Sequence, residues 1–320
     1  MPRPIRLLLL AASALLLLQT ALWWAAGLLL QGRAAAWVEL RRAEAWQISH
    51  GPPRRSGWPF AVRLDLPGME VEGPGLAWRA EGLSLRWNPL APRQLIAEPW
   101  GEQRLIAGPF ALPYRAELAR ALLPLCAAAG AEARLEMAGI TAPGLRIASG
   151  RARLTPDAAG IEVALTLEGL DLARPPPGPL GPRIARLSLE GSLSGPLPAA
   201  GGATRLAAWR EAGGAVVLRE LRIEWGAMSA SLTGRAGLDA GLRPAGEGVL
   251  VISGAQAGLE TLAAAGLLPP AAVGAARLLL GVMARPEPGS GVLRLSVAAR
   301  EGRLFLAGLP LLPLPPLAAP

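Results

Sequence analysis

The chain has 320 residues, enough for one large domain or two small ones, and 52% of them are hydrophobic. Its 39 Gly and 32 Pro favour short strands and turns over long helices. The formal charge is +8, but every basic residue is Arg, and these are scattered and often lie beside Glu. Because they form no long basic run, nucleic acid is not expected as a partner.

Residue types that carry catalysis or bind metals are sparse. Cys126 is the only cysteine and lies in an apolar stretch, which excludes an internal disulfide or a multi-cysteine metal site. His50 is the only histidine and has no second His or Cys nearby, as a zinc site would need. The chain has no Gly-x-Ser-x-Gly elbow and, without Lys, no Walker loop. We therefore expect no catalytic residues, no metal, no cofactor and no enzymatic activity.

The first predicted element is an N-terminal transmembrane helix. Leu7–Gly32 contains no charged residue, and a helix over this stretch would be about 39 Å long, enough to cross a hydrocarbon core of roughly 30 Å. Arg3 and Arg6 precede it without an acid, so the positive-inside rule places residues 1–6 in the cytoplasm and the remainder across the membrane. Ala34-Ala35-Ala36 resembles a cleavage site, but the apolar core is longer than that of a signal peptide, which favours an uncleaved anchor.

The helix is expected to continue beyond the membrane. Residues 33–48 are rich in the helix formers Ala, Leu, Glu and Arg, and Gly51-Pro52-Pro53 then ends the helix. Residues 1–50 are thus predicted to comprise a cytoplasmic stub, the transmembrane helix and its extension.

Five residues are expected at the membrane interface. Trp23 and Trp24 lie where the outer interface would be, and tryptophan is enriched there. Arg54 and Arg55 follow the end of the helix, where arginine can meet anionic headgroups. Trp58 comes next, and its amphipathic indole also suits an interface.

Most of the remaining chain alternates apolar and polar residues, which is typical of strands with one buried face. The clearest runs are 60–66, 83–87, 161–168, 221–225 and 293–297. They are separated by Gly, Pro or short polar turns. The fold class predicted is mainly β: a large curved, mostly antiparallel sheet with a few short helices after the transmembrane helix.

The Pro-rich run 174–182 is predicted to be either a stiff linker or a loop at the edge of one sheet. As a linker it would separate an N-terminal β lobe, 51–173, from a C-terminal β lobe, 183–309. A Leu/Pro tail, 310–320, follows the second lobe.

Three helical segments are expected after the anchor. Residues 114–128 are Ala/Leu-rich, although Pro124 would break or kink a helix there. Residues 204–212 read as a short helix that ends at a glycine. Residues 255–284 read as a helical hairpin.

The predicted strands have too few helices to cover their apolar sides. Either the sheet folds onto itself and hides this face, or it remains open as a groove that lipid or a partner occupies. The residues alone leave both open. The residues expected to line such a groove are Phe60, Val62, Leu64, Leu85, Trp87, Val163 and Leu165.

An ordered set of segments resembles the bacterial family called domain of unknown function 2125 over about residues 5–312. The segments are Gly57–Phe60, Trp209–Gly214, Leu221–Gly226, Leu238–Gly246, Leu262–Leu268, Glu301–Leu306 and Leu309–Leu311. This family is similar in pattern to the AsmA-like group. The resemblance implies a membrane-anchored envelope protein, a groove-forming sheet and phospholipid movement, and it supplies no catalytic residues.

These observations together predict a single-pass inner-membrane protein of a Gram-negative bacterium, with most of the chain in the periplasm. Its apolar β groove would bind or transfer lipid. The expected partners are inner-membrane lipids through their phospholipid acyl chains, and an envelope protein. The alternative is a non-enzymatic scaffold whose apolar surface binds a protein.

Overall fold

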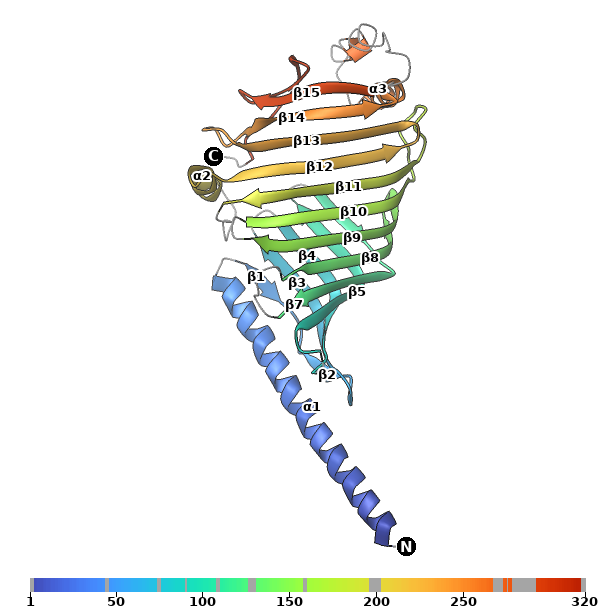
Figure 1. Ribbon diagram of the computed structural model, residues 1–320, viewed down its shortest axis with the longest axis vertical. Coiled ribbons are helices and arrows are strands. Elements are labelled where there is room, and N and C mark those ends of the chain that lie inside the picture. The colour runs from blue at the N-terminus through green and yellow to red at the C-terminus, as the bar shows by residue number, and fades with distance from the viewer. Residues whose placement is uncertain are drawn as a thin grey trace. The chain divides into compact units, whose positions relative to one another are not determined.

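The computed structural model describes residues 3–43, 46–73, 76–89, 91–107, 110–125, 131–157, 160–195, 203–266, 273–274, 276–277 and 292–317. The protein is mainly β, with one long N-terminal apolar helix, a large open antiparallel sheet and few short helices, as predicted (Figure 1). The chain divides into two compact units. Unit 1 comprises residues 1–113 and 119–128, and unit 2 comprises residues 114–118 and 129–320.

Unit 1 consists of the long helix and the first strands. Its elements are α1 (Arg3–Ala43), β1 (Gln47–Ser49), β2 (Arg54–Ser56), β3 (Val62–Gly73), β4 (Leu76–Trp87), β5 (Gln94–Ala107), β6 (Phe110–Tyr114) and β7 (Leu118–Pro124). Strand β3 pairs antiparallel with β1, β2 and β4, and β5 pairs with β4 and β7.

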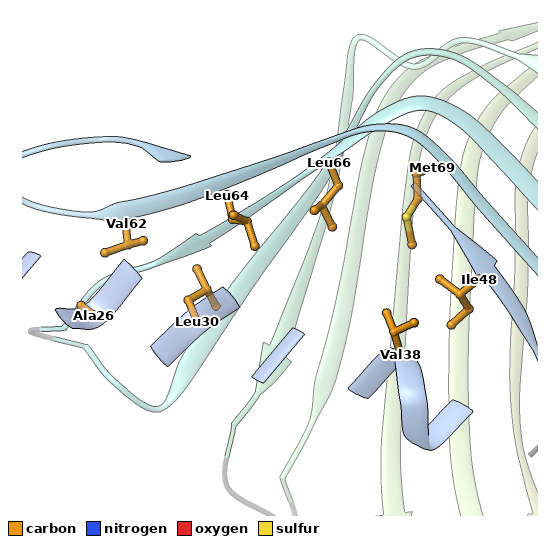
Figure 2. Packing of buried hydrophobic residues seen from close by; sticks show 8 residues of the cluster. All are labelled: Ala26, Leu30, Val38, Ile48, Val62, Leu64, Leu66 and Met69. Carbon is orange, nitrogen blue, oxygen red and sulfur yellow. The ribbon is translucent and has the colours of Figure 1, made fainter. Parts of the chain in front are cut away.

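The core of unit 1 lies between α1 and β3. Val62 and Leu64 are 0% and 1% exposed, and they lie against one face of the helix (Figure 2). The helix contributes Ala26, Leu30 and Val38. These residues are separated by four and by eight positions, about one and two turns, and therefore share a face of the helix. The C-terminal half of this apolar helix is thus covered on one side by protein.

Two stretches predicted to be helical contain strands. Helix α1 ends at Ala43 rather than Ile48, because Ile48 is 3% exposed in β1 and pairs with β3. In the segment 114–128, residues 118–124 form β7, which pairs with β5. Local Ala and Leu content favours helix, but the hydrogen bonds and apolar contacts of the sheet outweigh this small preference.

Unit 2 is a meander in which consecutive strands pair. Its strands are β8 (Ala133–Ala142), β9 (Leu145–Asp157), β10 (Gly160–Leu172), β11 (Arg183–Ser194), β12 (Ala215–Trp225), β13 (Met228–Leu238), β14 (Pro244–Ser253), β15 (Val292–Arg300), β16 (Arg303–Leu306) and β17 (Leu309–Pro313). Each pairs antiparallel with its neighbour in the chain, and the order from β8 to β15 is visible in Figure 1.

Two short helices lie at the strand ends of unit 2. Helix α2 (Ala203–Glu211) matches the predicted short helix, and Trp209 from it donates an indole hydrogen bond to the Ser194 carbonyl over 2.8 Å. Helix α3 (Ala255–Ala264) matches the first arm of the predicted hairpin. The second arm, 271–284, lies mostly outside the described residues.

The Pro-rich run 174–182 connects two neighbouring strands. Strands β10 and β11 pair down to Asp171 and Arg183, and the indole of Trp225 donates a hydrogen bond to the Gly181 carbonyl over 2.9 Å. The run therefore connects two paired strands of unit 2. The two units of the chain divide near residues 113–129.

Candidate functional site: an apolar sheet face

The register of unit 2 aligns leucines across eight consecutive strands. The residues lie directly opposite one another from β8 to β15, and seven of these eight positions are Leu. This leucine row consists of Leu135, Ala152, Leu165, Leu189, Leu221, Leu232, Leu250 and Leu295. Because directly opposed residues share a face of the sheet, the row is a continuous apolar stripe, about 34 Å long at the usual strand spacing.

Two parallel rows widen this stripe. One consists of Met137, Gly150, Leu167, Leu187, Ile223, Ala230, Ile252 and Leu293. The other consists of Leu154, Val163, Gly191, Leu218, Gly234, Gly248, Val297, Leu306 and Leu309. We call the three rows together the apolar face. Its plan area is about 440 Å², the size at which an exposed apolar patch is often functional.

The opposite face of the same strands is polar. The row between the leucine row and its first neighbour consists of Glu136, Arg151, Thr166, Ser188, Arg222, Ser231, Val251 and Arg294. Arg186 and Glu168 form an ion pair there at 2.9 Å. Such exposed pairs contribute about 0–1 kcal/mol, so this face suits solvent, whereas the apolar face does not.

The apolar face stays partly exposed among the described residues. In the leucine row only Leu295 is buried, and the other members keep intermediate exposure. Helix α2 lies at one end of the strands, where Trp209 meets Gly195 and Gly214. Helix α3 lies at the other end, where Gly258 approaches Met228. Neither contact reaches the middle of the leucine row.

The structure separates the residues predicted to line a groove. Val163 and Leu165 belong to the apolar face of unit 2. Val62 and Leu64 are instead fully buried beneath α1, so they form a closed core and not an open groove. Their burial follows from the apolar surface of α1, which covers β3.

The remaining predicted groove residues also lie in unit 1. Leu85 and Trp87 are partly buried at the margin of the α1–β3 core. Phe60 does not line that core, because it is 77% exposed in the connection between β2 and β3.

The residues predicted for the membrane interface gather around α1 and the β2–β3 connection. The Trp23 indole donates a hydrogen bond to the Ala61 carbonyl over 2.9 Å. The Arg55 guanidinium lies 4.8 Å from the centre of the Trp24 ring, within range of a cation–π interaction. Arg54 is exposed, and Trp58 is 49% exposed.

Sequence reasoning missed a polar cluster in unit 1. Ser84 is 1% exposed; it donates a hydrogen bond to the Asp65 carboxylate and accepts one from Arg63 over 2.8 Å. Burial by itself would raise the pKa of Asp65, but the hydrogen bonds from Ser84 and Arg63 outweigh burial and lower the pKa below its ordinary value. A serine on the polar side of an alternating strand gives no sign of such burial.

The described residues contain no group of three His, Cys, Asp or Glu side chains that could hold a metal ion. His50 is exposed, and its Nδ1 lies 2.7 Å from the Gly51 carbonyl oxygen. Cys126 lies outside the described residues.

One helix among the described residues is long and apolar enough to cross a membrane. The candidate span covers Leu9–Ala43 and has a mean hydropathy of 1.7. Residues Leu9 to Leu18 of this span are exposed, and Gln19, which meets the β2–β3 connection, is half-buried.

Comparisons with known proteins identify the family of this chain but no individual relative. No curated protein and no solved structure matches the chain. The model of the family DUF2125, described as uncharacterized proteins conserved in bacteria, matches residues 23–315. This match covers both units and nearly all of the described strands, so the chain belongs to the DUF2125 family.

Proposed function

We propose that the protein is anchored in the inner membrane by α1 and binds lipid acyl chains on the apolar face of unit 2. The observation that carries the proposal is the leucine row, which stays partly exposed on seven of its eight strands. An acyl chain gains from leaving water for a leucine surface by about 25 cal/mol for each Å² of apolar area buried. It needs no polar partner, and this face offers almost none.

The anchoring part of the proposal rests on the length and exposure of α1. Its N-terminal leucines, among them Leu9, Leu15 and Leu17, are more than half exposed. Arg3 and Arg6 precede this apolar stretch, which favours a cytoplasmic N-terminus with both units in the periplasm. The sequence resemblance to the AsmA-like group favours the same class of ligand and an envelope role, with transfer of phospholipid as the activity.

Photo-crosslinking tests the lipid site. A benzophenone amino acid is placed at Leu221 or Leu232 on the apolar face. The matched control positions on the polar face are Arg222, next to Leu221 on β12, and Ser231, next to Leu232 on β13. The full chain is irradiated in bacterial membranes, purified and examined by mass spectrometry. Phospholipid adducts at the two apolar positions and not at the two polar ones are expected.

Two outcomes would contradict lipid binding. Equal adducts on both faces would show that lipid contact is not specific to the apolar face. A single stoichiometric protein adduct at Leu221 and Leu232, with no lipid, would instead support the scaffold alternative. Topology is tested separately with a Leu40→Cys variant lacking Cys126: a membrane-impermeant maleimide should label it from the periplasmic side of intact cells with a permeabilised outer membrane.

A further inference from the structure

The connection between β2 and β3 is fixed to the side of α1 by three hydrogen bonds. We call residues 57–61 the β2–β3 tip. The Gln19 amide donates to the Pro59 carbonyl over 2.6 Å, and the Trp23 indole donates to the Ala61 carbonyl over 2.9 Å. The Trp58 indole donates to the Thr20 hydroxyl, with 3.3 Å between the two atoms. The tip therefore lies level with residues 19–23 of the helix.

The tip exposes large apolar side chains at this level. Phe60 is 77% exposed and Trp58 is 49% exposed, although both belong to a tightly held turn. On the adjacent helix, Leu17 and Leu18 are also more than half exposed. In water this would be an unfavourable cluster of apolar surface, whereas in hydrocarbon it would be favourable.

The length of α1 places the tip inside the bilayer. From Leu7 to Leu18 the helix rises only about 18 Å, whereas a hydrocarbon core is about 30 Å thick. A helix that enters the core at Leu7 leaves it near Ala26, which is about 10 Å beyond Gln19 and Thr20. Tilting the helix would require still more residues to cross, so it would submerge the tip further.

The tip would stay in water if the whole helix were shifted towards the periplasm, but this shift would cost free energy. To bring Gln19 to the boundary of the core, the sequence positions occupied by Arg3 and Arg6 would have to enter the hydrocarbon. Arginine is among the least favourable residues inside a membrane. A placement of the helix that keeps the tip outside the hydrocarbon is therefore disfavoured.

Several polar groups of the tip have partners within the protein, which favours a hydrocarbon environment. Ala61 N–H donates to the Gly57 carbonyl over 3.2 Å, and Pro59 has no N–H to satisfy. Thr20 donates to the Leu16 carbonyl within the helix over 2.7 Å. Gly57, at φ 96°, allows this closed turn, because a Cβ there would clash with the Ala61 carbonyl oxygen.

The charged residues lie beyond the tip on the side of the sheet. Arg55 contacts Trp24 and would lie against a Cβ placed at Gly27, which is just past the calculated end of the hydrocarbon core. Arg54 precedes it on β2 and is exposed. Both are thus at the depth where lipid phosphates lie.

We propose that the β2–β3 tip inserts into the hydrocarbon of the bilayer beside α1, with Phe60 and Trp58 contacting acyl chains. This inference rests on the membrane anchoring in the proposed function. It gives the protein a second membrane-embedded element in addition to its helix, and it assigns Phe60 to the bilayer and not to a lipid-binding groove.

Spin-label depth measurements test this insertion. Cys126→Ser removes the only cysteine, and single cysteines are then introduced by Phe60→Cys, Leu15→Cys or Leu40→Cys, all at residues more than half exposed. The full-length variants are labelled and reconstituted in vesicles of phosphatidylethanolamine and phosphatidylglycerol. Relaxation of each nitroxide by oxygen and by a water-soluble nickel complex reports its depth.

The label at position 60 should behave like the label at position 15. Both should be relaxed by oxygen, and their relaxation by nickel should be at least several-fold weaker than that of the label at position 40. A nickel-accessible label at Phe60 with a protected label at Leu15 would overturn tip insertion while leaving the anchor intact. Nickel access at both positions would overturn the anchor as well. The two failures are therefore distinguishable.

Discussion

Ser84, buried on β4, donates a hydrogen bond to Asp65 on β3, the residue directly opposite it in the sheet register. Arg63 also donates to the Asp65 carboxylate, over 2.8 Å. The carboxylate is thus held in its ionised form on the polar side of unit 1. Its pKa lies below the ordinary value of 3.8 even though burial acts in the opposite direction.

This arrangement predicts a pH-dependent contribution to stability. Because the folded-state pKa of Asp65 is lower than the unfolded one, ionised Asp65 stabilises the fold above about pH 4. The contribution is lost as the pH falls through the folded-state pKa. Asp65→Asn should lower the free energy of unfolding by about 1 kcal/mol at pH 7, and the difference from the wild type should shrink below about pH 4.

Denaturant unfolding in mild detergent at pH 3 to 7 would measure this difference. The matched control is Glu70→Gln, on the same strand, because Glu70 is half exposed and its ion pair with Arg79 is 3.7 Å long. That control should change stability by less than about 0.5 kcal/mol. An Asp65→Asn difference that stayed constant over this pH range would contradict the assignment.

The α1–β3 core predicts a large effect of truncating Leu64. Leu64→Ala removes a side chain that is 1% exposed and leaves a cavity under the helix, so it should cost roughly 2–4 kcal/mol. Leu105→Ala on β5 is the control, since Leu105 is 37% exposed and should cost less than about 1 kcal/mol. Thermal unfolding in detergent measures both. Similar losses for the two variants would mean that α1 does not cover β3 in solution.

The contact between Trp209 and Gly214 predicts that α2 can pack against the sheet only if residue 214 has no side chain. A Cβ at Gly214 would clash with the Trp209 ring, which is 7% exposed. Gly214→Ala should therefore destabilise unit 2 by about 1–3 kcal/mol. Gly237→Ala is the comparison, because a Cβ there would approach only the Gly214 carbonyl oxygen, at 3.4 Å. A shift in the unfolding midpoint for Gly237→Ala as large as that for Gly214→Ala would refute the steric explanation.

The apolar face predicts a side-dependent effect of charge on lipid retention. Leu232→Asp places a carboxylate in the leucine row, whereas Ser231→Asp places one on the opposite face of the same strand. The first should reduce co-purifying phospholipid several-fold, because an acyl chain cannot solvate the charge, and the second should leave it unchanged. Native mass spectrometry after detergent extraction gives the ratio. Equal retention by both variants would show that the lipid lies elsewhere.

Local sequence patterns predicted those helices and strands whose conformation is determined by residues close to them in the sequence. Alternating runs indicated strands such as β10, β12 and β15, and α2 was predicted from the glycine that follows it. The segment around β7 was predicted wrongly, because its Ala and Leu content favours helix while its pairing with β5 is a long-range interaction. Burial of Ser84 was missed for the same reason.

The candidate site was predictable only in part. Alternation indicates which side of each strand is apolar, and in the structure Val163 and Leu165 lie on such a side. It does not give the register between strands, which here also depends on irregularities such as that between Glu190 and Gly191. The covering of Val62 and Leu64 by α1 was not predictable, because the helix has no charged residue from Leu7 to Gly32 and its sequence there does not show which side meets β3.

The sequential pairing of β8 to β17 has a consequence for biosynthesis. Each described strand of this sheet can pair with the one made just before it. Most of the loops to be closed are therefore short and their contacts local, the longer connections being 195–214 and 254–291. If β8 emerges first during synthesis, the chain can therefore add one strand at a time to the growing edge of the sheet. Insertion or loss of a hairpin within the meander would lengthen or shorten the leucine row without changing its register elsewhere.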